Sequence, residues 1–332
     1  MGPSARAASD RDLFADGLRD QGVGELGYRP NATAVALRTH RSQVLGLLIR
    51  NLHNPFFLDV VDGFDGACAA AGYEVMIGSS RYDPSREWEL LHAFQDRGVD
   101  GLAVAPIGTG PAVGDWAEDY RCPLVLLNAP PPQAGAAVMS VRGVGAAAVA
   151  QAVRHLVELG DRELTLVVAP ADKDPEPERP ERFRALARES GFAARVVETE
   201  PGLDAAREAV GRVSAEPPSR RPTAFLTNSD HLAQAVYLAA ADLGWRVPED
   251  LSVVGHDDLP TAALLAPPLT TLRVDRREIG RRAATLLIDS LEGRPPARRD
   301  VVVRVDLRVR QSSSPADIAN SQDRKPELPC RN

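Results

Sequence analysis

The chain has 332 residues, of which 44% are hydrophobic and 26% charged, and its formal net charge is −7 at pH 7. This length and composition are typical of a globular protein with two cores or one bilobed body. Because the net charge is negative, the protein surface taken as a whole does not bind polyanions. No run reaches the ~18 apolar residues of a membrane-spanning helix, and the first residues lack the apolar core of a signal peptide. We therefore expect a cytoplasmic protein that does not enter a membrane and contacts nucleic acid only locally.

The first informative segment in chain order is ELGYRPNA, at residues 25–32. Pro30 fixes its own φ and keeps the preceding residue out of the helical region, so the chain turns there. Asn31 is a good N-cap, and Ala32–Leu37 has the length of about one and a half helical turns. A helix this short needs a partner to form in water, where roughly a dozen residues are required.

That segment has two interpretations. Leu37 can act as an apolar wedge in a DNA minor groove, with Arg29, Arg38 and Arg41 near phosphates. The alternative is an ordinary loop and short helix that lead into a strand. The residues alone leave both open.

From residue 44 onward, short apolar runs alternate with amphipathic stretches, which predicts parallel α/β structure. The predicted strands are Val44–Ile49, Glu74–Ser79, Gly101–Ala105, Leu124–Leu127, Leu164–Val168, Ala194–Val197, Ala224–Thr227, Leu251–Val254 and Val301–Arg308. The predicted helices are Pro55–Ala71, Pro84–Arg97, Gly145–Leu159, Glu178–Ser190, Ala205–Ser214, His231–Leu243 and Arg276–Leu291. Because the pattern restarts at Gly145, we expect two doubly wound halves, with a ligand cleft where the carboxyl ends of their strands face each other.

Signatures of enzymes are weak in this chain. Gly143–Ala148 fits GxGxxA at the start of a helix, but the next strand ends in Ala169-Pro170, without the acid that would hold a ribose. Walker, GxSxG and HExxH motifs are missing, and the histidines and cysteines lack metal-ligand spacing. We expect no catalytic residues, no metal and no cofactor.

Three segments resemble the lactose-repressor (LacI/GalR) family of bacterial transcription regulators. ELGYRPNATAVALRT at residues 25–39 is similar to the family's hinge, NPFF at 54–57 to the start of its first helix, and VPEDLSVVGHDD at 247–258 to a later strand. PLTT at 268–271 follows this strand, as it does in the family. The matches occur in the family's order and cover residues 25 to about 310.

The resemblance implies two doubly wound parallel-sheet lobes of the type I periplasmic-binding-protein kind, joined by several crossovers and preceded by a short helical hinge. The implied domains are a degenerate or truncated DNA-binding region at 1–24, a hinge at 25–42, an effector domain at 43–310 and a disordered tail at 311–332. Within the effector domain, lobe 1 is expected at about 43–140 and 271–298, and lobe 2 at about 141–270 and 299–310.

The resemblance also suggests functional residues. The hinge residues that would contact DNA are Arg29, Asn31, Ala34, Leu37 and Arg38. The residues that would contact the effector are Phe56, Phe57, Asn128, Arg179, Ser229, Asp230 and Asp257. The side-chain chemistry supports three of these effector residues. The rings of Phe56 and Phe57 can stack on a sugar face, and the Asp257 carboxylate at a strand end can accept hydrogen bonds from adjacent hydroxyls.

Three departures from the family's pattern bear on the ligand. Asn128-Ala129 stands where many members have Asp-Arg, Val141 replaces the acid of the family's DNxxG step, and Val274 stands where many sugar binders have a glutamine. We therefore expect a less polar pocket than that of a typical hexose binder.

The function implied is a dimeric, DNA-binding transcription regulator whose operator affinity is controlled by a sugar or a sugar derivative bound between two lobes. Residues 1–24 show no recognition-helix pattern, so operator binding by this chain is left open. The alternative is a stand-alone small-molecule-binding protein that does not bind DNA.

Overall fold

The computed structural model describes residues 41–120, 122–131, 138–143, 145–174, 176–294 and 298–313. From Val44 onward these residues belong to one compact unit. The predicted hinge residues Arg29, Asn31, Ala34, Leu37 and Arg38 lie outside the described residues.

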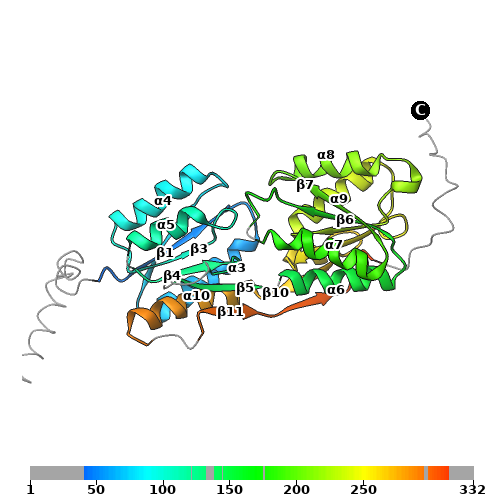
Figure 1. Cartoon of the computed structure of the whole chain (residues 1–332). Coiled ribbons are helices and arrows are strands. Elements are labelled where there is room, and N and C mark those ends of the chain that lie inside the picture. The colour runs from blue at the N-terminus through cyan, green and yellow to red at the C-terminus, as the bar shows by residue number, and fades with distance from the viewer. Residues whose placement is uncertain are drawn as a thin grey trace, which may run out of the picture. The chain divides into compact units, whose positions relative to one another are not determined.

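Lobe 1 is built on a six-stranded sheet with the strand order β11-β5-β4-β3-β1-β2 (Figure 1). Its strands are β1 (Val44–Ile49), β2 (Glu74–Ser79), β3 (Gly101–Val104), β4 (Leu124–Leu127), β5 (Val138–Gly143) and β11 (Asp300–Val303). Its helices are α3 (Phe56–Ala70), α4 (Pro84–Asp96), α5 (Pro111–Asp119) and α10 (Arg276–Leu291). All pairs of neighbouring strands in this sheet are parallel, as the sequence predicted.

Lobe 2 repeats the architecture with the strand order β12-β10-β9-β8-β6-β7. Its strands are β6 (Glu163–Val168), β7 (Ala193–Glu198), β8 (Ala224–Thr227), β9 (Ser252–Asp257), β10 (Thr270–Val274) and β12 (Val305–Arg308). Its helices are α6 (Gly145–Glu158), α7 (Glu178–Ser190), α8 (Leu203–Ser214) and α9 (Asp230–Asp242), with short 3₁₀ turns η1 (Pro218–Arg220) and η2 (Pro260–Ala263). The strands are parallel except that β12 pairs with β10 in the antiparallel sense.

Each sheet is covered by helices on both faces, which explains its continuous apolar strands. In β1, Leu45, Leu47 and Ile49 pack in the core layer that includes α3 and α10, whereas Leu48 packs in the layer that includes α4 and α5. Figure 1 shows these helix pairs on opposite sides of the lobe 1 sheet. In lobe 2, α6 and α7 cover one face and α8 and α9 cover the other.

The chain passes between the two sheets three times in the described residues, and each passage lies a few residues later than predicted. The whole of β5 belongs to lobe 1, so the first passage follows Gly143. The whole of β10 belongs to lobe 2, so the second follows Val274. The predicted strand Val301–Arg308 is two strands, one in each sheet, with Arg304 between them.

Residues 311–313, the described part of the expected disordered tail, are packed against lobe 2. Ser312 is fully buried; its Oγ accepts from the backbone N–H of Thr270 (2.7 Å) and donates to the carbonyl of Val253 (2.6 Å). Ser313 makes a hydrogen bond with His155, at 2.8 Å. Residues 311–313 therefore belong to lobe 2, because they form hydrogen bonds with polar groups at the starts of β9 and β10.

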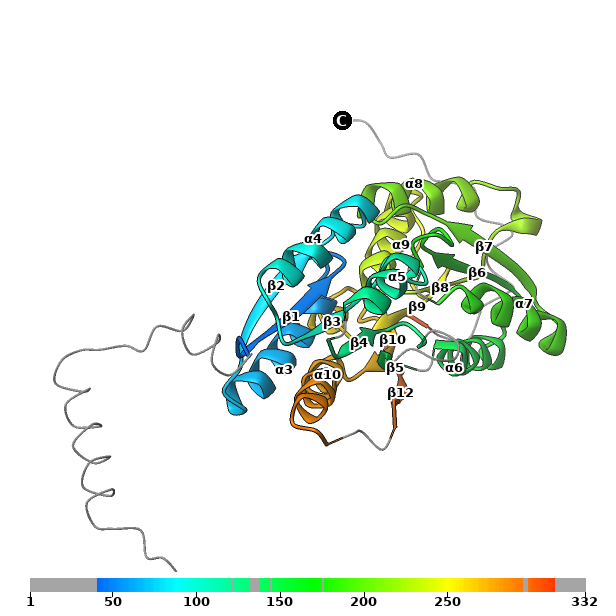
Figure 2. The same cartoon turned by 60° about the vertical axis from the view of Figure 1, so that its left-hand side comes forward.

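Helices α3 and α10 make an unusually close contact in lobe 1, where they lie side by side (Figure 2). A Cβ atom on Gly63 would lie 2.0 Å from the carbonyl oxygen of Arg277, and one on Gly280 would lie 2.0 Å from the carbonyl oxygen of Val60. Two glycines thus allow the helix backbones to touch, which places the start of α10 against α3.

The two lobes touch through a glycine as well. Gly108, in the loop after β3, has φ +56°, and a Cβ atom there would lie 2.4 Å from the carbonyl oxygen of Asp172, in the loop after β6.

We predict that Gly63→Ala lowers the free energy of unfolding by about 2–3 kcal/mol, because overpacking forces the two helix backbones apart. The matched control is Gly66→Ala on the same helix, where a Cβ would meet nothing within 4 Å. This control should stabilise the protein by roughly 0.5–1 kcal/mol, since alanine loses less backbone entropy than glycine. Urea unfolding measures both, and equal effects of the two substitutions would contradict the close-packing argument.

We predict that Gly108→Ala moves the lobes apart and increases the radius of gyration measured by small-angle X-ray scattering. Gly98→Ala is the matched control, because Gly98 has φ +63° and no atom within 4 Å of an added Cβ. Both variants should lose roughly 1–2 kcal/mol of stability from left-handed backbone strain. A scattering profile of Gly108→Ala identical to that of Gly98→Ala would show that this contact does not set the lobe spacing.

Candidate functional site

A cavity of about 150 Å³ lies between the lobes, at the carboxyl ends of the strands of both sheets. Lobe 1 contributes Arg50, Asn51, His53, Asn54, Phe56, Tyr82 and Asn128. Lobe 2 contributes Ala169, Lys173, Asp174, Arg179, Thr199, Pro201, Gly202, Asn228, Ser229, His231, Leu232 and Asp257. This is the place where open parallel sheets bind ligands.

Strained backbone is concentrated around this cavity. Arg81 and Tyr82, after β2, have φ +56° and +59°, and Asn128, after β4, has φ +50°. At the end of β9, Asp257 and Asp258 have φ +116° and +55°. Residues other than glycine rarely adopt a positive φ. Residues held in this backbone conformation are common at functional sites.

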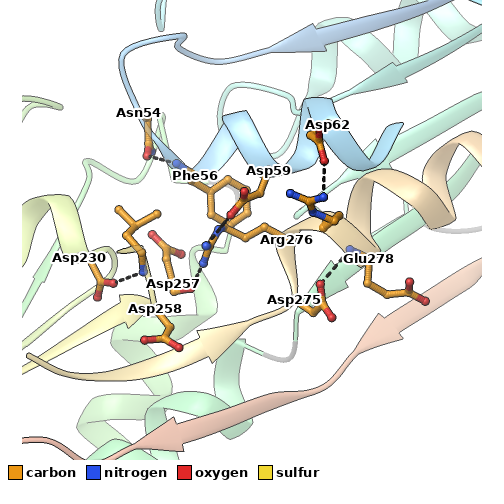
Figure 3. A network of polar contacts seen from close by, with 12 residues as sticks. Asn54, Phe56, Asp59, Asp62, Asp230, Asp257, Asp258, Asp275, Arg276 and Glu278 are labelled. Carbon is orange, nitrogen blue, oxygen red and sulfur yellow. Dashed lines mark hydrogen bonds and ion pairs between the residues drawn. The ribbon is translucent and has the colours of Figure 1, made fainter. Parts of the chain in front are cut away.

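Asp257 ends β9 and lines the cavity, and Figure 3 shows it beside Arg276. It is 6% exposed, and its carboxylate makes no hydrogen bond to any described residue, while its backbone carbonyl accepts one from Nη1 of Arg276. Burial, and then the nearby charge of Asp230, raise the pKa of Asp257 well above its usual value. Arg276, Arg179 and Arg50 oppose that shift. The carboxyl group is therefore available to a ligand in the cavity.

Arg276 connects this acid to lobe 1. Its Nε and Nη2 donate to one oxygen of Asp59 on α3, at 2.9 and 2.6 Å, and Figure 3 shows the guanidinium between Asp59 and Asp257. Since Arg276 begins α10 and Asp257 ends β9, the contact joins the two lobes beside the cavity.

Asp230 lies behind the cavity wall rather than in it. It is fully buried, and its carboxylate accepts from Thr271 Oγ1 (2.5 Å) and from the backbone N–H of Leu259 (2.7 Å). Burial raises its pKa to about 7, and these two hydrogen bonds oppose the shift. The residue predicted as an effector contact instead fixes the turn that follows Asp257.

Of the two predicted aromatic residues, only one lines the cavity. Phe56 lines the cavity, and its ring meets Phe57 edge-on with centroids 5.2 Å apart. Phe57 is 1% exposed, is absent from the lining, and packs beneath the Arg50 guanidinium, which lies 5.5 Å from its ring centroid.

The remaining predicted residues line the cavity. Asn128 contributes from lobe 1. Ser229 Oγ accepts from the backbone N–H of Leu232 (3.2 Å), which caps α9. Arg179 Nε pairs with Glu176 at 2.6 Å. The arginine is thus held by an acid on the turn before its own helix.

Sequence reasoning did not select several lining residues, among them Arg50, Asn51, Thr199 and Asn228. All of them lie within two residues of a strand's end: β1, β7 and β8 end at Ile49, Glu198 and Thr227, respectively. A search for polar residues at every strand end would have found them. The part of the chain that the structure describes shows no cluster of acids, histidines and cysteines that could hold a metal, and no helix long and apolar enough to cross a membrane.

Known proteins resemble this chain in sequence and in fold. The family model of the periplasmic binding protein-like domain matches residues 153–313. The HTH-type transcriptional repressor PurR of Aliivibrio fischeri strain MJ11 is 28% identical over 298 residues, which cover 88% of this chain and 87% of the repressor. The HTH-type transcriptional regulator DegA of Bacillus subtilis is 27% identical over 299 residues, 88% of this chain and 87% of that regulator.

Among solved structures, a putative ribose operon repressor from Burkholderia thailandensis superposes with a TM-score of 0.71 at 28% identity, covering 81% of this chain and 99% of that one. A LacI family transcriptional regulator from Enterococcus faecium, solved with bound ribose, shares the fold with a TM-score of 0.72 at 21% identity, covering 82% of this chain and 100% of that one. The chain thus carries a periplasmic binding protein-like domain at residues 153–313 and is similar over most of its length to the transcriptional regulators PurR and DegA and to a putative ribose operon repressor.

Proposed function

We propose that this protein is a transcription regulator that acts as a homodimer and whose affinity for operator DNA is controlled by a small-molecule effector. The observation that carries the proposal is the cavity at the strand ends, because it is lined by both lobes. A ligand held by both lobes stabilises the closed arrangement over the open one, and this difference in affinity shifts the equilibrium.

The effector class proposed is a sugar or sugar derivative. Phe56 offers an aromatic face, the Asp257 carboxylate can accept bonds from adjacent hydroxyls, and Asn128 and Asn228 supply amides from opposite lobes. The Enterococcus faecium relative was solved with ribose, which agrees with this class. We propose that the ligand undergoes no chemical change.

The response to the effector would travel through the lobe contacts. Arg276 joins Asp257 to Asp59, and α10 packs tightly on α3, so a ligand that binds Asp257 also acts on the α3–α10 pair of lobe 1. In the proposed mechanism, lobe closure orders or melts the hinge at residues 25–42 and thereby changes DNA affinity.

We predict that Asp257→Asn weakens binding of the tightest of D-ribose, D-glucose, D-galactose and their acid derivatives by about 2–4 kcal/mol, because a charge-assisted hydrogen-bond acceptor is lost. Isothermal titration calorimetry measures the affinity, and urea unfolding checks the fold. Asp62→Asn, which removes an exposed acid of α3 that pairs with Arg277, should leave the affinity unchanged. Unchanged affinity in Asp257→Asn would remove this carboxylate from the proposed site.

We predict that selection from a random duplex library enriches a two-fold symmetric sequence, and that Leu37→Ala weakens binding to it by loss of the minor-groove wedge. Fluorescence anisotropy at fixed salt compares the selected duplex with a scrambled one. Leu264→Ala, at a loop leucine that is 80% exposed, is the matched control and should bind DNA normally. If no sequence is enriched, the DNA-binding part of the proposed function is wrong.

A further inference from the structure

Arg50 has a buried guanidinium that opens on the cavity. It follows β1 directly, is 8% exposed and lines the cavity wall. Nη1 donates to the carbonyl of Pro106 at 3.1 Å, and the group lies over the Phe57 ring. A guanidinium carries five N–H donors, so most of its donors are left for another partner.

The other cations of the wall have counter-ions. Arg179 pairs with Glu176 at 2.6 Å, and Lys173 pairs with Glu200 at 2.5 Å. Arg50 has no carboxylate within ion-pair distance among the described residues. A charge removed from water without a partner is unfavourable, so an anion that enters the cavity gains most at this guanidinium.

Glu87 is a buried acid of lobe 1 that feels the charge of Arg50 but does not form an ion pair with it. It is 2% exposed, and Oε2 accepts from the backbone N–H of Ile107 at 2.9 Å. Burial raises its pKa to about 7, so it carries only part of a negative charge near neutral pH. Glu87 and Arg50 together fix the backbone of residues 106–107, next to the Gly108 contact with lobe 2.

We infer that the effector carries an oxyanion, bound by Arg50 of lobe 1, in addition to hydroxyls bound by Asp257 of lobe 2. The ligand class is therefore an acidic sugar derivative, and this inference rests on the proposed function. A planar guanidinium suits a carboxylate or a phosphate, which accept two parallel hydrogen bonds. Arg50 and Asp257 come from opposite lobes, so a ligand that has both chemical groups favours lobe closure, whereas a neutral sugar leaves Arg50 without a counter-ion.

Matched pairs of probes test the inference by isothermal titration calorimetry on the full chain. The pairs are D-glucuronate with D-glucose, D-galacturonate with D-galactose, and D-ribose 5-phosphate with D-ribose. In at least one pair the acidic probe should bind ~10-fold or more tightly than its neutral partner, as expected for a buried charge-assisted contact. The first two pairs report on a carboxylate and the third on a phosphate.

Variants then assign the preference to Arg50. Arg50→Gln should abolish the preference for the acidic probe, and Arg50→Lys should keep part of it, because lysine keeps the charge but not the planar fork. Arg86→Gln is the matched control: Arg86 lies on α4, outside the cavity, and pairs with Glu89. If Arg50→Gln does not fold, the preference of the unaltered chain and the reduced preference of Arg50→Lys still decide the question.

Two results would overturn the inference. One is that no acidic probe binds more tightly than its neutral partner, and the other is that the preference persists in Arg50→Gln. If a neutral sugar binds at least as tightly as its acidic partner and loses affinity in Asp257→Asn, the oxyanion is excluded while the proposed function stands. The DNA selection tests that function independently of any probe.

Discussion

The structure depends on one constraint of connectivity, which is that the chain passes between the two sheets three times in the described residues. Several short connections on one side allow two rigid lobes to rotate as a hinge but prevent them from separating. The carboxyl ends of the strands in both lobes border the same cavity. The position of the candidate site follows from this connectivity, because the polar residues that end the strands are then brought together from both halves of the chain.

The balance of charge in the cavity gives the site its chemical character. Arg179 and Lys173 are compensated within the protein, whereas Arg50 and the Asp257 carboxylate are not compensated by direct contact with described residues. A guanidinium and a carboxyl group that are held apart in a closed space remain poorly solvated until a ligand reaches both of them. Such a site selects strongly against ligands that leave one of its groups unpaired. This is the physical basis for expecting discrimination between acidic and neutral sugars.

Rigidity around the cavity comes from contacts that do not involve a ligand. The buried Asp230 carboxylate is saturated by Thr271 and Leu259 and holds the turn after Asp257, which is itself in a strained conformation. Arg276 fixes the carbonyl of Asp257 from the other lobe. The Asp257 carboxyl group is therefore preorganised by the residues behind it. If Asp257 moved on ligand binding, Arg276 would move with it and would shift the α3–α10 pair.

Local periodicity determined the alternation of strands and helices, since apolar runs and amphipathic stretches are legible within a window of a few residues. The position of Asp257 at a strand end was predictable for the same reason, and the three matching segments pointed to the two-lobed architecture.

Other features depend on partners far along the chain. Nothing within Val138–Gly143 marks it as a strand of lobe 1, and the run from Asp300 to Arg308 is divided between two sheets only because β5 and β10 lie beside its two halves. Asp230 turns away from the ligand because Thr271 and Leu259 reach its carboxylate, and Arg50 faces the cavity without a counter-ion because no acid of the folded lobes comes within ion-pair distance among the described residues. These outcomes are set by long-range packing and the placement of buried charges, which local sequence does not encode.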